Sequence, residues 1–243
     1  MQSKPRPKGR RPDELRKIEF IPSPQKAPDG SVLIKWGDTH VLCSVSIEDK
    51  VPNWMGSKPT GWITAEYGML PGSSDKRIHR DKIRSTGRTH EIQRLIGRSL
   101  RACIDMKELG LRTITLDCDV VQADGGTRVA AITGSYVALR MALAKLREKG
   151  TFKHIPKTTM VSAVSLGRHH GGLILDLEYV EDVEAELDSN VVMNEHGEFI
   201  EIQGTAEKGT FKRAEWDELL SLAEKGCRDL FEIQRRTIQE WGL

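Results

Sequence analysis

The chain has 243 residues, of which 38% are hydrophobic and 30% are charged, and its formal net charge is +2. This composition is ordinary for a soluble globular protein, and the near-neutral charge argues neither for nor against a nucleic-acid partner. No apolar run reaches the roughly 20 residues that span a bilayer, and the polar, basic start excludes a secretory signal, so we expect a cytoplasmic protein.

Residues 1–18 are rich in Pro, Lys and Arg, and we expect them to form a flexible arm that orders only against a partner. No linker divides the chain after this arm. Residues 19–243 are therefore predicted to form a single mixed α/β (α+β) domain. We expect its sheets to be built from β-hairpins with packed helices rather than from strict βαβ alternation.

Alternation and helical spacing of apolar residues predict the elements of this domain. In chain order they are strands at 32–36, 41–47 and 62–67, a helix at 89–107, a strand at 113–121, a helix at 127–148, strands at 161–166, 173–179, 191–193 and 199–203, and a helix at 214–240. Two hairpins end in an apolar residue followed by Glu-Asp, at 47–49 and 180–182, which is compatible with an internal duplication. The four cysteines lack Cys-x-x-Cys spacing, which indicates reduced, buried thiols rather than a zinc site.

The first candidate site is the turn Asp124-Gly125-Gly126-Thr127-Arg128, which follows a strand and opens a helix. Backbone N–H groups at a helix N-terminus favour an anion. Glycine allows close approach of the backbone, Thr127 adds a hydroxyl donor, and Arg128 adds a planar charged fork. Because the spacing matches neither the dinucleotide-binding motif nor a P-loop, inorganic phosphate is the ligand that we expect, with a purely structural turn as the alternative.

Arg88 lies at the start of the helix predicted at 89–107, where positive charge is normally unfavourable. An anion between Arg88 and the other helix start would explain it, and a solvent-exposed arginine is the alternative. The later arginines of this helix are expected to form ion pairs within the helix or with another chain; these are Arg94, Arg98 and Arg101, with Glu91 and Asp105 as the candidate partners.

Acidic residues are concentrated at 181–188. In an extended chain residues six apart point to the same face, so Asp182 and Asp188 are expected to converge across the intervening bend. Paired carboxylates can hold magnesium, or one of them can protonate a leaving oxygen. An Asx-type turn at 188–190 is the alternative. His169 and His170 lie in a hairpin turn and are not expected to bind a metal, because adjacent histidines rarely do so without other ligands.

Taken together, these segments resemble the bacterial ribonuclease PH family. The resemblance is carried by 61–71 (GWITAEYGMLP), 87–98 (GRTHEIQRLIGR), 116–128 (LDCDVVQADGGTR), 176–182 (DLEYVED) and 203–207 (QGTAE). It extends from about Ser31 to the C-terminal helix, which is nearly the whole chain.

The resemblance implies a phosphate-dependent nucleotidyltransferase, a phosphorolytic 3′-to-5′ exoribonuclease. In such an enzyme inorganic phosphate attacks the last 3′ phosphodiester of transfer RNA precursors and other RNAs, and a nucleoside diphosphate is released. The resemblance further implies that phosphate is bound by Arg88, Gly126, Thr127 and Arg128, and that Asp182 and Asp188 are catalytic and hold magnesium.

The family also implies a hexameric ring, a trimer of dimers, and a basic RNA-binding loop containing Lys76, Arg77, Arg80, Lys82 and Arg84. Many relatives carry arginine where this chain has Gly72, so RNA affinity is expected to depend more on Arg77 and Arg80. One alternative is a non-catalytic RNA-binding ring subunit, but such a subunit would be expected to lose the phosphate arginines or the acidic pair. A second is a phosphate-binding enzyme acting on small metabolites, against which the long basic loop argues.

Overall fold

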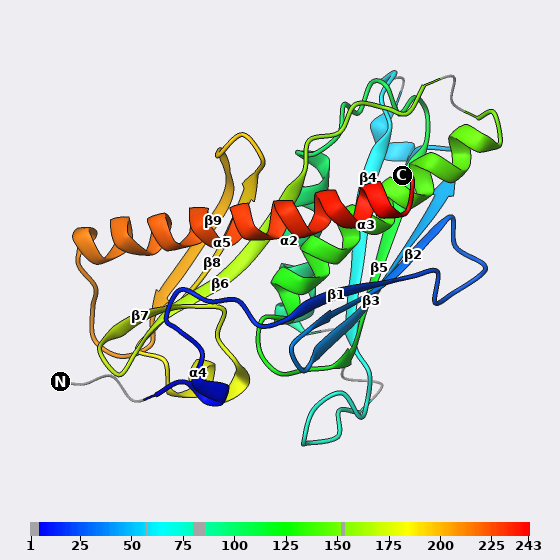
Figure 1. Ribbon diagram of the computed structural model, residues 1–243. Coiled ribbons are helices and arrows are strands. Elements are labelled where there is room, and N and C mark those ends of the chain that lie inside the picture. The colour runs from blue at the N-terminus through cyan, green and yellow to red at the C-terminus, as the bar shows by residue number, and fades with distance from the viewer. Residues whose placement is uncertain (1–4, 57, 80–85, 152–153) are drawn as a thin grey trace.

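Two β-sheets with helices between and outside them form the computed structural model, which describes residues 5–56, 58–79, 86–151 and 154–243 (Figure 1). The first sheet has the strand order β1-β2-β3-β5-β4 and the second has β7-β6-β8-β9. Only the pairing of β4 with β5 is parallel among the pairings of these strands. The strands are β1 Ile18–Pro22, β2 Gly30–Trp36, β3 Thr39–Glu48, β4 Trp62–Met69, β5 Thr113–Gln122, β6 Val161–His169, β7 Gly172–Leu175, β8 Leu187–Asn194 and β9 Phe199–Ala206. The α-helices are α2 Gly87–Arg101, α3 Thr127–Glu148, α4 Tyr179–Glu184 and α5 Arg213–Glu240.

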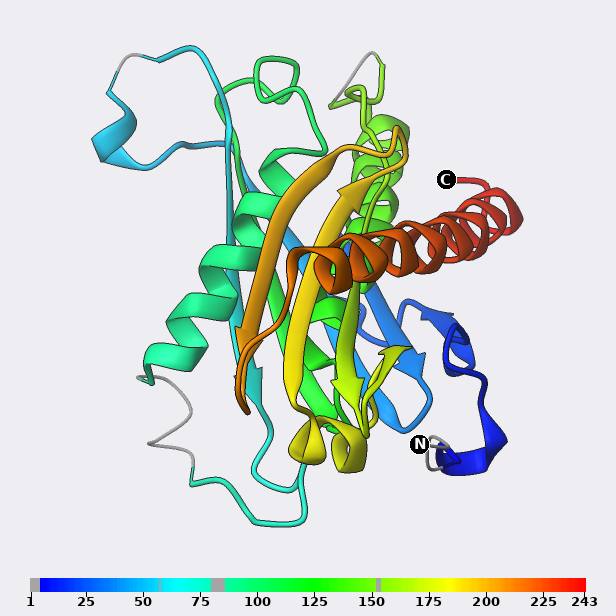
Figure 2. The same cartoon turned by 90° about the vertical axis from the view of Figure 1, so that its left-hand side faces the viewer.

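Helix α3 lies between the two sheets, in contact with β2 and β3 on one side and β6 on the other (Figures 1 and 2). Strand β6 is buried on both faces: the Ala163 N–H donates to the Thr133 hydroxyl of α3, whereas the Ser162 hydroxyl donates to the Cys227 carbonyl of α5. Gly134 permits the close approach of α3 to the first sheet, because a Cβ there would lie 2.8 Å from the Ile34 side chain. One continuous hydrophobic cluster therefore joins both sheets.

The length and composition of α3 also match a membrane span, and within the described ranges it is the helix with this property. Its apolar window is, however, 78% buried inside the fold. A helix that is apolar on all sides is expected at the centre of a protein core, and α3 occupies that position.

The predicted hairpin around Gly37, the strand at 113–121 and the helix at 127–148 are confirmed, and all four cysteines are buried and free. The helix predicted at 89–107 ends at Arg101, because the chain then turns and Ile104 forms a bridge with Thr158. Strand β1 was not predicted. The alternative of an Asx turn at 188–190 is wrong, since these residues lie within β8 and pair with β6.

The second hairpin also differs from its prediction, because β7 ends at Leu175 instead of 179. A capping box between Glu178 and Glu181 starts the short helix α4 there. The two Glu-Asp matches consequently occupy different structures: Glu48 ends strand β3, whereas Glu181 lies in α4. This pair of matches therefore gives no support to an internal duplication.

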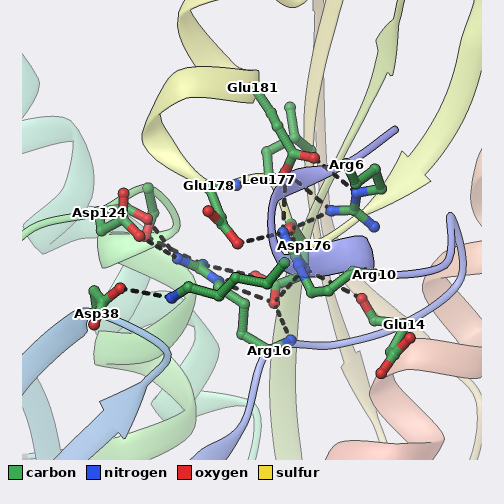
Figure 3. Close-up of polar contacts among 12 residues, drawn as sticks. Arg6, Arg10, Glu14, Arg16, Asp38, Asp124, Asp176, Leu177, Glu178 and Glu181 are labelled. Carbon is green, nitrogen blue, oxygen red and sulfur yellow. Dashed lines mark hydrogen bonds and ion pairs between the residues drawn. The ribbon is translucent and has the colours of Figure 1, made fainter. Parts of the chain in front are cut away.

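The N-terminal arm was expected to order only against a partner, and this is wrong for its described part, residues 5–18. Arg6 and Arg16 are only 7% and 6% exposed. They pair with Glu181 and Asp176 of the same chain, so the arm packs against α4 and the end of β7 (Figure 3). The physical reason is that its arginines find buried acidic partners within the fold.

Candidate functional site

A cleft of about 560 Å³ opens at the carboxyl ends of the parallel strands β4 and β5, between the two sheets. Its first wall consists of the turn from β5 into α3 and the start of α2. Its second wall comes from β6, α4 and β8. The lining residues are Met69, Ser74, Asp75, Lys76, Arg88, Ala123, Asp124, Gly125, Gly126, Thr127, Arg128, Ser165, Leu177, Tyr179, Asp182, Asp188 and Asn190. The cleft thus contains all the residues predicted to bind phosphate and both predicted catalytic carboxylates.

The turn between β5 and α3 has the backbone form that its glycines allow. Gly125 and Gly126 have φ of 76° and 67°, the left-handed region that favours glycine. Gly126 is the N-cap of α3 and supplies no side-chain cap, so the first N–H groups of α3 remain available to an anion. Behind the turn, the Thr39 hydroxyl accepts the N–H of Asp124 and donates to the carbonyl of Gly125 at 2.6 Å.

Two of the predicted phosphate ligands have partners that the sequence did not reveal. The hydroxyls of Thr127 and Tyr67 are 2.8 Å apart, and burial is the main cause that raises the pKa of Tyr67. Arg128 donates to Glu91 at 3.2 Å and to Gln203 at 3.1 Å, which holds its guanidinium at the edge of the cleft. These supporting residues come from β4, α2 and β9, and only their place in the family motifs hinted at them.

Arg88 lies in the first turn of α2, after an N-cap in which the Thr86 hydroxyl accepts the Thr89 N–H at 3.1 Å. Its side chain is exposed toward the cleft. Two later arginines of α2 have partners other than Glu91 and Asp105: Arg98 binds Glu201 of β9 at 2.7 Å, and Arg101 donates to the carbonyl of Ile63.

Asp182 and Asp188 reach the cleft from different elements, α4 and β8. The two carboxylates converge on the cleft as predicted. They do not do so as residues of one extended chain, because a helix and a strand present them. Burial raises the pKa of Asp182. Burial, together with the neighbouring charge of Asp182, raises the pKa of Asp188 to about 6. Within the described part of the chain neither carboxylate makes an ion pair, so both retain free oxygens for a cation.

The cleft therefore carries positive charge on one wall and negative charge on the other. Arg88, Arg128 and the N-terminus of α3 attract an anion on one side, and two carboxylates attract a cation or hold a proton on the other. The charges of the arginines lower the pKa of Asp182 against the effect of burial, which indicates that the two sides act on each other. Such a cleft can hold two anionic groups together and neutralise the charge that their reaction develops.

The basic residues predicted to bind RNA are only partly described. Lys76 lines the cleft, and Arg77 is exposed next to it. Arg80, Lys82 and Arg84 lie outside the described residues.

His169 and His170 gain a third neighbour that the sequence did not suggest. The Nε2 atoms of both rings lie within 3.4 Å and 3.1 Å of the same Glu184 oxygen, at the end of α4. Two imidazoles and a carboxylate are a donor set that suits zinc. The reason given for expecting no metal here, the lack of a further ligand, is therefore wrong. That these histidines bind no metal remains a prediction.

Comparisons with known proteins give consistent matches over most of the chain. A family model described as "3′ exoribonuclease family, domain 1" matches residues 14–144, and "3′ exoribonuclease family, domain 2" matches residues 159–226. A curated protein named Ribonuclease PH, from Syntrophomonas wolfei, is 55% identical over 232 residues. That alignment covers 95% of this chain and 97% of the relative.

Solved structures share the fold at lower identity. A chain of the Archaeoglobus fulgidus exosome with RNA bound to the active site matches with a TM-score of 0.81 and 19% identity, over 93% of this chain and 91% of that one. Rice (Oryza sativa) Rrp46 matches with a TM-score of 0.78 and 19% identity, over 96% of this chain and 100% of that one. At this identity the matches show the same fold.

Proposed function

The chain belongs to the 3′ exoribonuclease family, whose two models match residues 14–144 and 159–226, and from this premise we propose that its cleft removes nucleotides from RNA 3′ ends by phosphorolysis. The 55% identity to a Ribonuclease PH over 95% of the chain supports this activity. One observation carries the proposal: an anion site at the start of α3, flanked by Arg88 and Arg128, faces Asp182 and Asp188 across one cleft.

In the proposed reaction, an oxygen of inorganic phosphate attacks the phosphorus of the last 3′ phosphodiester. The bond from that phosphorus to the 3′ oxygen of the preceding nucleotide breaks, and the 3′ oxygen takes up a proton. The terminal nucleotide leaves as a nucleoside diphosphate. Arg88, Thr127, Arg128 and the N–H groups that follow Gly126 bind and orient the attacking phosphate. Positioning and charge neutralisation supply most of the catalysis, since the protein forms no covalent bond.

Asp182 and Asp188 would hold a magnesium ion, which would neutralise charge beside the departing 3′ oxygen. The donor set fits this ion, because both carboxylates line the cleft. Burial is the main cause that raises the pKa of each, and a nearby cation would stabilise their ionised forms. Without a magnesium ion bound, the pKa of Asp188 is about 6, and Asp188 could then instead carry the proton that the leaving oxygen takes up.

RNA would enter past the loop that carries Lys76 and Arg77, with Arg80 and Arg84 as further contacts. Transfer RNA precursors are the proposed substrates, and a hexameric ring is the proposed assembly. A cytoplasmic location is also part of this proposal. The proposed ring rests on the family to which the chain belongs.

Replacement of Arg88 tests the phosphate assignment, because this side chain is exposed in the cleft and supports no part of the core. Arg88→Ala should reduce phosphorolysis at least 100-fold while the affinity for RNA changes less than threefold. The exposed Arg213→Ala on α5 serves as the control. The readouts are nucleoside diphosphate release and RNA binding by fluorescence anisotropy. An equal loss of RNA binding and phosphorolysis would refute the assignment.

A further inference from the structure

The N-terminal strap, defined as residues 6–16, introduces three arginines into a buried acidic cluster (Figure 3). The arginine side chains are 4–7% exposed, and the three buried acidic side chains among their partners are 0–8% exposed. The arginines are Arg6, Arg10 and Arg16, and the acids are Asp176, Glu178 and Glu181. Buried charges are costly unless they are paired, and each of these arginines is paired with a buried acid.

Arg16 connects this cluster to the phosphate turn. Its guanidinium binds the buried Asp176 carboxylate at 2.7 Å and also donates to the carbonyls of Asp124 and Gly125. In a trans peptide the N–H points away from the carbonyl of the same unit, and these peptides are trans. The N–H groups of Gly125 and Gly126 are thereby directed away from Arg16, and both glycines line the cleft.

Thr39 of β3 adds to this fixation from the same side. Its hydroxyl donates to the Gly125 carbonyl at 2.6 Å and accepts the Asp124 N–H at 2.9 Å. Thr39 is fully buried. Two side chains that do not line the cleft therefore determine the orientation of the turn that does.

Arg6 and Arg10 act on the other wall of the cleft. Arg6 holds Glu181 through two hydrogen bonds, at 2.7 and 3.0 Å, and Arg10 reaches the same carboxylate at 3.0 Å. Glu181 also closes the capping box of α4 and directly precedes Asp182. A helix of six residues has little stability of its own, so its position depends on such outside contacts.

We propose that the strap positions both halves of the active site: Arg16, with Thr39, orients the phosphate turn, and Arg6 fixes the helix that presents Asp182. This inference rests on the proposed phosphorolytic function. Neither arginine touches the reacting groups, and each acts through the residues that it holds. The strap also joins the two walls, because Asp176 receives Arg16 while its own carbonyl accepts Arg6.

The test compares Arg6→Lys and Arg16→Lys, because lysine keeps the charge but lacks the fork that binds two acceptors at once. Arg16→Lys should raise the KM for phosphate at least tenfold and leave the magnesium concentration for half-maximal activity within threefold. Arg6→Lys should do the opposite, raising the magnesium requirement at least fivefold with the phosphate KM within threefold. Arg11→Lys, whose side chain is 72% exposed in the same segment, should change neither.

A merely structural role would reduce the active fraction, which lowers kcat in both variants and moves neither the phosphate KM nor the magnesium requirement; this result would overturn the proposal. If Arg16→Lys does not fold, Thr39→Val removes both hydroxyl bonds to the turn without leaving a buried charge. It should raise the phosphate KM, and Thr39→Ser, which keeps the hydroxyl, should restore it. An unchanged phosphate KM in Thr39→Val would overturn the claim that contacts to the phosphate turn orient it for phosphate binding. Phosphate-independent cleavage by the wild-type protein would instead refute the proposed function itself.

Discussion

At the scale of single residues, the Asp188 carboxyl makes the stability of the fold depend on pH. Burial and the adjacent Asp182 raise its pKa to about 6, so ionising it in the folded chain costs free energy. The unfolded chain has no such cost, because the pKa there is near the ordinary value of 3.8. Asp188 therefore favours folding below about pH 4, and this contribution is lost as the pH rises through 6.

Asp188→Asn should accordingly stabilise the protein at neutral pH when phosphate and magnesium are left out. The difference in unfolding free energy between this variant and the wild type should increase by at most about 3 kcal/mol from pH 4 to pH 6. Above pH 6 it should stay constant. Urea unfolding at a series of pH values measures this difference. Asp217→Asn on the exposed surface of α5 is the control and should show no such trend. A difference that is constant from pH 4 to pH 7 would contradict the raised pKa.

At the scale of elements, the phosphate turn and α4 are packed against each other. The Tyr179 N–H, at the start of α4, donates to the Asp124 carboxylate at 3.3 Å. Gly125 lies close to the segment that precedes α4, because a Cβ added to Gly125 would be 2.5 Å from the Leu177 carbonyl oxygen. The sequence predicted the turn from its glycines and its place between a strand and a helix. It could not predict this packing, because the contact joins residues more than 50 positions apart.

Gly125→Ala should disturb both elements at once. The substitution forces a side chain into the left-handed region and against the Leu177 carbonyl, so we expect a loss of at least about 2 kcal/mol in unfolding free energy. The phosphate KM should rise with it. Gly171→Ala is a matched control, since its φ of 75° is almost the same and a Cβ there would meet nothing within 4 Å. Equal losses in the two variants, measured by urea unfolding, would contradict the packing argument.

At the scale of the whole molecule, the sequence predicted most strands and helices, because their apolar periodicity reflects burial in two sheets and in α3. It also identified Arg88, Gly126, Thr127, Arg128, Asp182 and Asp188, which line the cleft and of which all but Asp188 lie in contiguous motifs. It did not predict the docking of the arm, since a stretch rich in Arg and Pro appears solvated unless its acidic partners are known. Glu181 and Asp176, which bind it, are more than 150 positions away. Partners at such separation are determined by the fold and not by local pattern.

The surface around the cleft should determine RNA affinity. Gly72 is exposed in the loop before Lys76, and a Cβ there would meet nothing within 4 Å. Gly72→Arg should therefore leave the unfolding free energy within about 0.5 kcal/mol and strengthen RNA binding. The slope of log affinity against log salt should become more negative by about 0.7, the value for one further contact to a phosphate of a single strand. Gly72→Ala is the control, and an unchanged slope in Gly72→Arg would place the RNA path elsewhere.

The central claim is that inorganic phosphate, rather than water, is the attacking group. The direct measurement incubates the purified protein and magnesium with a transfer RNA precursor labelled at its last nucleotide, with and without inorganic phosphate, and identifies the released nucleotide. The account predicts nucleoside diphosphates that appear only when phosphate is present. Nucleoside monophosphates under both conditions would show hydrolysis and contradict the assignment of Arg88, Thr127 and Arg128 to the attacking phosphate.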